Sequence, residues 1–153
     1  MERLIELYGD MLYDFCESVL WSPKNAVIAF KILVRRLRHH FHQGHLYSEY
    51  ERAWVLKIAC EELRSLASKH GRRLSPPEQV MLDASLESDT RLKYFDSYFH
   101  RLGLEEQMLL LLRDKYGIPY SEIACAFGLG EESIKTKRQH ALRALEEWLW
   151  ERQ

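Results

Sequence analysis

Residues 116–145 place the strongest constraint on how this chain folds, because their small and apolar residues are spaced as in two short helices joined by a tight turn. Pro119 and Ser121 are typical of a helix start, where a missing N–H costs nothing and a hydroxyl can cap. Gly128 follows Ala124 by four residues and can take the positive φ that such a turn needs. The stretch therefore predicts a helix, a glycine turn and a second helix.

Apolar residues at helical spacing define the inward faces of these two helices. Ile123, Ala124 and Phe127 share one face of the first helix, and Ile134 anchors the second helix six residues after the turn glycine. We expect Phe127, Leu129 and Ile134 to lie in the core. A small residue, a glycine turn and an apolar anchor form the packing pattern of a DNA-binding helix-turn-helix. An ordinary helical hairpin, which also favours glycine in its turn, is the alternative.

The second helix is amphipathic, as expected of a helix that lies on DNA. Ile134, Ala141 and Leu145 form one apolar stripe, whereas the other faces are polar. Such polar and cationic side chains reach phosphates and base edges, although a solvated helix face has a similar composition. Glu131 and Glu132 suit the helix N-terminus and would repel a nearby phosphate. The candidate DNA-binding residues are Ser133, Lys135, Thr136, Lys137, Gln139, His140 and Arg143.

The charge balance argues against a protein that coats nucleic acid without sequence preference. The 153 residues contain 22 Lys and Arg against 23 Asp and Glu, and no part of the chain is a strongly basic block. DNA binding would then depend on local patches or on a partner. The hydrophobic content of 46%, with only 7 glycines and 4 prolines, favours an all-α fold.

Apolar periodicity divides the rest of the chain into helices and a linker. We expect helices at 2–20 and 23–41, with Ser22 capping the second, and a third helix that follows a Ser48 cap. The apolar faces of the first two helices are expected at Leu4, Leu7, Tyr8, Met11, Leu12, Phe15 and Val19, and at Val27, Phe30, Leu33, Val34 and Leu37.

Residues 71–90 contain two adjacent prolines, scattered charges and serines, as expected of a linker. Helical periodicity resumes near Thr90. We therefore predict two small helical domains, residues 1–70 and residues 91–153, of which the second carries the helix-turn-helix.

The sequence also indicates a cytoplasmic protein. No apolar run is long enough to span a membrane, and the acidic, amphipathic N-terminus differs from a signal peptide. Cys16, Cys60 and Cys125 are far apart and odd in number, which is typical of free thiols in a reducing compartment.

No pattern for catalysis or for a cofactor stands out. The chain has no Gly-rich phosphate loop, no nucleophile elbow and no HExxH motif, so we expect a protein that is not an enzyme and needs no cofactor. His39, His40, His42 and His45 cluster at the end of the second helical segment, but no cysteine or carboxylate lies beside them at ligand spacing. We interpret them as a solvated, partly protonated loop and expect no metal site.

Two stretches of the chain resemble one known family. Residues 104–145 are similar to the C-terminal promoter-binding domain of bacterial sigma factors of the extracytoplasmic-function type, most clearly in LLLLRDKYGIPYSEIACAFGL and SIKTK. Residues 50–66, YERAWVLKIACEELRSL, resemble the aromatic-rich helix with which this family meets melting promoter DNA. The resemblance implies an N-terminal domain that binds RNA polymerase and the −10 element, and a C-terminal domain that binds the −35 element.

The resemblance also implies roles for individual residues. The second helix of the family docks on polymerase through an acidic stretch, whereas here it is apolar and basic, with Lys31 and Arg35 as candidate polymerase-facing residues. Glu61 and Glu62 would repel DNA, and Glu61 is placed to pair with Lys57. The candidate promoter-melting surface, in which Trp54 could equally be a core residue, consists of Tyr50, Arg52, Trp54, Lys57 and Arg64.

One further departure concerns the recognition helix, where Arg138 stands in place of the family's usual inward leucine. The most direct interpretation of the whole sequence is a sigma-factor-like transcription initiation factor, with core RNA polymerase, promoter DNA and an anti-sigma factor as expected partners. The alternative is a sigma-like interaction protein that binds a sigma factor, an anti-sigma factor or polymerase without contacting a promoter itself.

Overall fold

The residues described by the computed structural model are 2–20, 22–42, 50–70 and 98–151. Every regular element among them is helical, which confirms the predicted all-α fold. The predicted linker, the Ser48 cap, His45 and the helix start near Thr90 lie outside the described residues. The two domain boundaries therefore stay a prediction.

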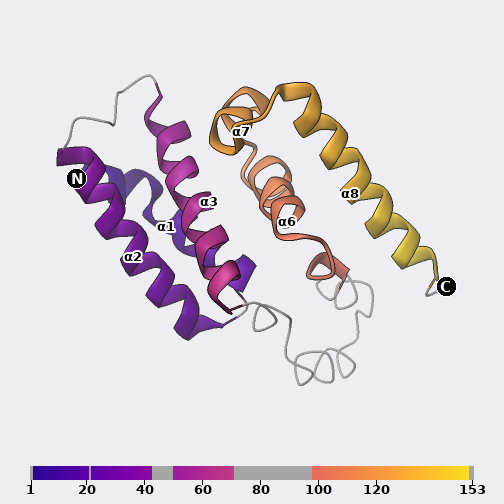
Figure 1. Ribbon diagram of the computed structural model, residues 1–153, viewed down its shortest axis with the longest axis horizontal. Helices are drawn as coiled ribbons and strands as arrows, with labels where there is room; N and C mark the ends of the chain where they lie inside the picture. Colours follow the sequence, from indigo (N-terminus) through magenta and orange to yellow (C-terminus); the bar gives the residue numbers. More distant parts are fainter. Residues whose placement is uncertain (1, 21, 43–49, 71–97, 152–153) are drawn as a thin grey trace.

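Three helices form the N-terminal part of the fold: α1 (Glu2–Leu20), α2 (Pro23–His42) and α3 (Glu51–His70) (Figure 1). The predicted cap of α2 is confirmed, because the Asn25 N–H donates a hydrogen bond of 3.2 Å to the Ser22 hydroxyl. Three of the clustered histidines, which we had expected in a loop, belong to the last turn of α2.

The apolar faces of α1 and α2 were predicted only in part. Phe15 and Leu33 are fully buried, as expected. Leu7 and Val27 were predicted to be core residues, but they are 57% and 38% exposed. The inner face of α2 is instead narrower, because small alanines such as Ala29 allow α1 and α3 to pack closely on it.

The C-terminal part of the fold consists of α6 (Leu104–Leu110), the π-helical segment η2 (Leu111–Lys115), α7 (Tyr120–Phe127) and α8 (Glu131–Glu151). The helix α7 begins after Pro119, whose carbonyl accepts the N–H groups of Glu122 and Ile123 at 3.1 Å each. No side-chain hydrogen bond caps α7, so the expected capping role of Ser121 is wrong.

Two glycines with positive φ stand at helix ends in the C-terminal part: Gly117 after η2 and Gly128 after α7. Gly128 has φ of 68°, and the following N–H, that of Leu129, donates 3.1 Å back to the carbonyl of Ala124. This is the left-handed helix end that the sequence predicted for the turn. Gly117, with φ of 67°, follows the π-helical segment η2 and also has a left-handed φ.

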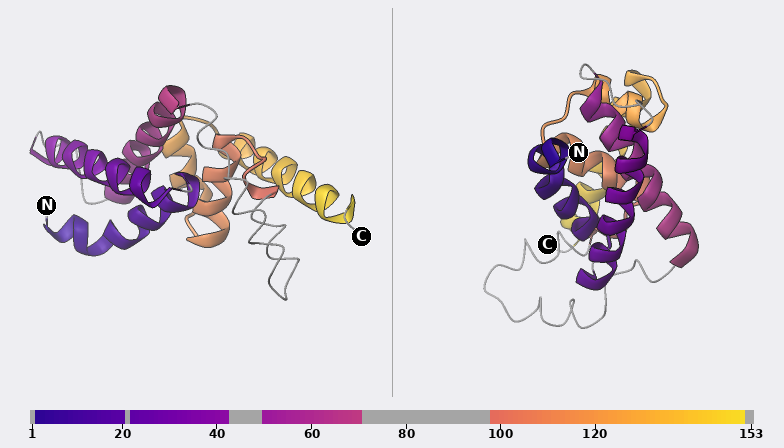
Figure 2. Two further views of the ribbon diagram at one scale, coloured as in Figure 1. Left: turned by 90° about the horizontal axis from the view of Figure 1, so that it is seen from below. Right: turned by 90° about the vertical axis from the view of Figure 1, so that its left-hand side faces the viewer.

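The two parts of the molecule share one continuous apolar core. The helix α3 packs against α7, and α1 packs against α6, so the N-terminal helices cover the inner side of the C-terminal helices (Figure 2). Phe15 of α1 meets the ring of Tyr116 edge-on, with ring centroids 6.3 Å apart. The C-terminal half of α8 extends to one side of this body (Figure 1).

The core assignment predicts a large difference between two neighbouring residues. Ile134 is completely buried, whereas Leu129, which we had expected in the core, is 40% exposed beside the turn. Ile134→Ala should lower the free energy of unfolding by about 2–5 kcal/mol, because it leaves a cavity under α8. The matched control Leu129→Ala should cost about 0.5 kcal/mol or less. Urea denaturation of both variants checks this, and equal losses would contradict the assignment.

Candidate nucleic-acid interface

The two helices α7 and α8, which form the predicted helix-turn-helix, are packed as the sequence predicted except at Leu129 and, in part, Phe127. Ile123 and Ala124 of α7 are buried, and Phe127 is partly buried against the core. The apolar stripe of α8 is buried as well, at Ile134, Ala141 and Leu145. This packing fixes which side of α8 is turned outward.

The outward side of α8 is polar along its first four turns. All seven residues predicted to bind DNA are exposed, namely Ser133, Lys135, Thr136, Lys137, Gln139, His140 and Arg143. Lys135 lies 3.5 Å from Glu132 in an exposed ion pair, which contributes little to stability. Hydroxyl, amide and cationic groups are thus available together on the exposed side of one helix.

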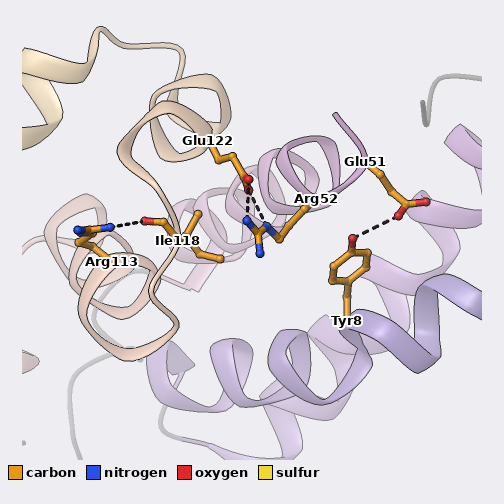
Figure 3. A network of polar contacts seen from close by, with 6 residues as sticks. All are labelled: Tyr8, Glu51, Arg52, Arg113, Ile118 and Glu122. Atoms are coloured by element: carbon orange, nitrogen blue, oxygen red, sulfur yellow. Dashed lines mark hydrogen bonds and ion pairs between the residues drawn. The ribbon is translucent and has the colours of Figure 1, made fainter. Parts of the chain in front are cut away.

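The candidate promoter-melting residues on α3 fall into two groups. The first group, Arg52 and Arg64, faces the C-terminal helices and is hydrogen-bonded to their carboxylates. The Arg52 guanidinium forms two hydrogen bonds of 2.6 Å with the Glu122 carboxylate of α7 (Figure 3). Arg64 pairs in the same two-pronged way with Glu105 of α6, and its guanidinium lies 5.3 Å from the ring centroid of Phe127.

Hydrogen bonds to carboxylates have the largest effect on the pKa of these two arginines. The hydrogen bond to Glu122 raises the pKa of Arg52, and the hydrogen bond to Glu105 raises the pKa of Arg64. Both arginines stay charged, and both are occupied by carboxylates of the C-terminal helices. Neither is free to contact a phosphate in this arrangement.

The second group of α3 residues surrounds an open pocket at the edge of the contact with α7. Ala53, Trp54 and Lys57 line it from α3, Tyr50 lines it from the turn just before α3, and Cys125 lines it from α7. The Lys57 ammonium lies 5.0 Å from the Trp54 ring centroid, a cation–π contact. Trp54 is only partly buried, so it supports the core and also contributes a ring edge to this pocket.

The two glutamates that follow on α3 have partners other than the one we expected. Glu61 was predicted to pair with Lys57, but it lies 2.9 Å from Arg36 of α2. Glu62, which is largely buried, lies 3.3 Å from the same guanidinium. Arg36 thus holds both carboxylates against α2, which leaves Lys57 in contact with Trp54.

The candidate polymerase-facing residues lie on the opposite side of α2 from this pairing. Lys31 and Arg35 are exposed, whereas Arg36 is turned toward α3. No acidic residue occurs within α2, so the charged residues on its outward face are all basic, although apolar side chains such as Ile28 are exposed there as well.

Several residues that join the two parts of the molecule were missed by the sequence analysis. Glu105 and Glu122 are the carboxylates that engage α3, and Asp14 of α1 lies 2.8 Å from the Lys115 ammonium of η2. Burial opposes ionisation of Asp14, but hydrogen bonds from Lys115 and Tyr116 outweigh it and lower its pKa. No local sequence signal identifies such residues, because each partner lies far away in the chain.

A further polar contact ties α1 to the start of α3. Glu51 is buried, and it accepts a hydrogen bond of 3.2 Å from the Tyr8 hydroxyl (Figure 3). Arg3 donates a second hydrogen bond to the same carboxylate. Burial, followed by the charge of Glu51, raises the pKa of Tyr8. This contact fixes the first turn of α3 and thereby the position of Arg52.

Comparison with known proteins gives a match in structure but not in sequence. No protein-family model and no curated protein sequence matches the chain. Its fold is similar to that of the sigma factor RpoE from Bartonella quintana, crystallised in complex with the anti-sigma factor NepR. The TM-score is 0.73 at 18% identity, over 98% of this chain and 96% of the other. At this identity the similarity establishes a sigma-factor-like fold.

Among the described residues, no helix is both long enough and apolar enough to span a bilayer.

The three cysteines should react very differently. Burial raises the pKa of the Cys16 and Cys60 thiols to about 12, whereas Cys125 is exposed beside the α3 pocket. A thiol reagent at pH 8 should therefore modify one cysteine per native chain quickly, and all three after denaturation. Cys125→Ser should abolish the fast phase. A second fast thiol in the native chain would contradict the burial of the N-terminal core.

Proposed function

We propose that this chain is a sigma-factor-like transcription initiation factor that binds core RNA polymerase and promoter DNA, with no covalent chemistry of its own. The observation that carries the proposal is the exposed polar row on α8, presented by a helix-turn-helix within a sigma-factor-like fold. Because polymerase acts on DNA in the cytoplasm of bacteria, the proposal also makes the protein cytoplasmic.

In this proposal α8 enters a major groove with its first four turns. Lys137 and Arg143 neutralise phosphates, while Ser133 and Gln139 contact base edges, because hydroxyl and amide groups can donate and accept hydrogen bonds. Glu131 and Glu132 lie at the N-terminus of α8, are exposed and repel phosphate. The first turn of α8 therefore stays away from the DNA backbone.

The N-terminal domain has to change its contacts before the whole candidate surface of α3 can meet DNA. Arg52 and Arg64 are paired with carboxylates of α7 and α6. A DNA strand can therefore contact these arginines only if it displaces the carboxylates or if the helices separate first. Tyr50, Trp54 and Lys57 already border an open pocket and offer rings and a cation to single-stranded bases. We infer that α3 is only partly available for promoter melting in this arrangement.

A second candidate function rests on the same engagement of α3. If α3 never leaves α7, the chain is a sigma-like interaction protein that binds a sigma factor, an anti-sigma factor or polymerase. The basic outward face of α2, with Lys31 and Arg35, differs from the acidic polymerase-docking stretch of the family and supports this alternative. The anti-sigma factor in the complex of the similar sigma factor makes a protein of that class a proposed partner here.

One experiment separates the two candidates: in vitro transcription with purified core polymerase and this chain as the sole specificity factor. Initiation at defined start sites, found by sequencing the transcripts, supports the initiation factor. Core polymerase binding without specific initiation supports the interaction protein. Absence of binding to core polymerase would contradict the first proposal.

DNA binding by α8 can be tested through its salt dependence. Lys137→Ala and Arg143→Ala should each weaken binding to duplex DNA and reduce the slope of log K against log salt by about one unit, because each removes a phosphate contact. Ser133→Ala and Gln139→Ala should change sequence preference more than slope. The control is Lys69→Ala, an exposed lysine at the end of α3 that should leave the slope unchanged. If the full chain binds no duplex in a random-site selection at low salt, this part of the proposal fails.

The availability of α3 can be tested by removing one carboxylate. Glu122→Ala frees Arg52 from α7, so it should strengthen binding of a fluorescent single-stranded oligonucleotide up to roughly fivefold, the equivalent of a half-exposed ion pair. Glu147→Ala removes an exposed carboxylate of α8 and should change this affinity much less. If both variants gain equally, the effect is one of overall charge and Arg52 has no special role.

A further inference from the structure

Arg138 occupies an inward position on the recognition helix α8. Its place, four residues after Ile134 and three before Ala141, is on the apolar stripe that packs against the rest of the fold. Its side chain is only 28% exposed, whereas the neighbouring Lys137 and Gln139 are turned outward. The guanidinium therefore lies at the solvent-exposed edge of this stripe, where its contacts set how the side chain is held.

The partner of Arg138 is Asp114, which lies in the π-helical segment η2 just ahead of the helix-turn-helix. Nε and Nη2 of Arg138 donate to the two carboxylate oxygens of Asp114, at 3.0 and 2.6 Å. Two parallel hydrogen bonds between planar groups restrict both distance and orientation. The hydrogen bond to Asp114, which outweighs the opposing effect of burial, raises the pKa of Arg138.

The aromatic ring of Tyr120 supports the same junction from the first turn of α7. The Arg113 guanidinium lies 4.5 Å from this ring centroid, and the Lys135 ammonium lies 5.6 Å from it. Arg113 also donates a hydrogen bond of 3.2 Å to the carbonyl of Ile118, and this bond holds the chain between η2 and α7 (Figure 3). The end of η2, the start of α7 and the first turns of α8 are thus joined by charged and aromatic side chains.

We propose that Arg138 is a positioning residue, which sets the orientation of α8 for DNA through its ion pair with Asp114 and does not itself contact DNA. This inference rests on the proposed DNA binding and assigns the pair a role in it. The competing interpretation is that Arg138 leaves Asp114 and binds a phosphate, as an arginine on a recognition helix often does.

The two interpretations predict opposite effects of one substitution. Asp114→Asn weakens the ion pair and removes a negative charge near the DNA. If Arg138 contacts phosphate, this change frees it, and duplex binding becomes tighter. If Arg138 is a positioning residue, α8 loses its fixed orientation, and binding weakens. Glu146→Gln removes one exposed negative charge from α8 and serves as the control for the general effect of charge on DNA affinity.

The experiment measures affinity and salt dependence of the full chain for the duplex recovered by random-site selection. We expect Asp114→Asn to weaken binding roughly five- to tenfold relative to Glu146→Gln, with an unchanged salt slope because no phosphate contact is lost. Arg138→Leu should weaken binding as well, since it leaves Asp114 unpaired. The double variant Asp114→Leu/Arg138→Leu should recover most of the affinity, because it restores an apolar contact at the junction.

Several outcomes would overturn the inference. Tighter binding by Asp114→Asn, or a double variant that stays as weak as Arg138→Leu, would make Arg138 a DNA contact. Hydrogen exchange without DNA provides an independent readout: Asp114→Asn should accelerate exchange in residues 131–141 and leave α2 unchanged. If the unaltered chain binds no duplex at all, the proposed function fails, and the exchange result alone then decides whether Arg138 positions α8. Unchanged exchange in α8 would refute that role.

Discussion

The packing of α3 against α7 is the contact on which the rest of this structure depends. It joins the N-terminal and C-terminal helices into one apolar core, with the Arg52–Glu122 ion pair at its edge. The Arg64–Glu105 pair holds α3 to α6 beside this contact. These pairs are partly exposed, so each contributes about 1 kcal/mol or less. Buried apolar surface therefore supplies most of the stability of the contact, and the ion pairs mainly fix which face of α3 meets α7 and α6.

This contact divides the polar chemistry of the molecule into an available part and an engaged part. The outward row of α8 is exposed, whereas two of the five candidate promoter-melting residues on α3 are bound to carboxylates. Under the proposed function, duplex DNA can bind α8 without any change in fold. Single-stranded DNA meets a smaller surface, formed by Tyr50, Trp54 and Lys57.

Local rules predicted most of the pair of helices α7 and α8 and the turn between them, because their constraints lie within a few residues of one another. The left-handed Gly128 and the buried Ile134 follow from turn geometry and helical spacing. Periodicity was less reliable at Leu7 and Val27, since each helix buries a narrower face than its apolar residues suggest. The partners of Arg52 and Arg64 were out of reach, because Glu122 and Glu105 lie 70 and 41 residues away. The roles proposed for the site residues stay predictions.

The physical nature of the contact also limits what can open it. Salt screens the two ion pairs, but it strengthens or leaves unchanged the apolar packing between α3 and α7. The same salt weakens phosphate contacts steeply, so raising ionic strength is a poor way to expose α3 to DNA. A binding partner acts differently, because it shifts the equilibrium by its preference for the open form. Under the proposed function, exposure of α3 therefore requires a partner that binds the separated helices more tightly than the packed ones, and core polymerase is the partner that the proposal supplies.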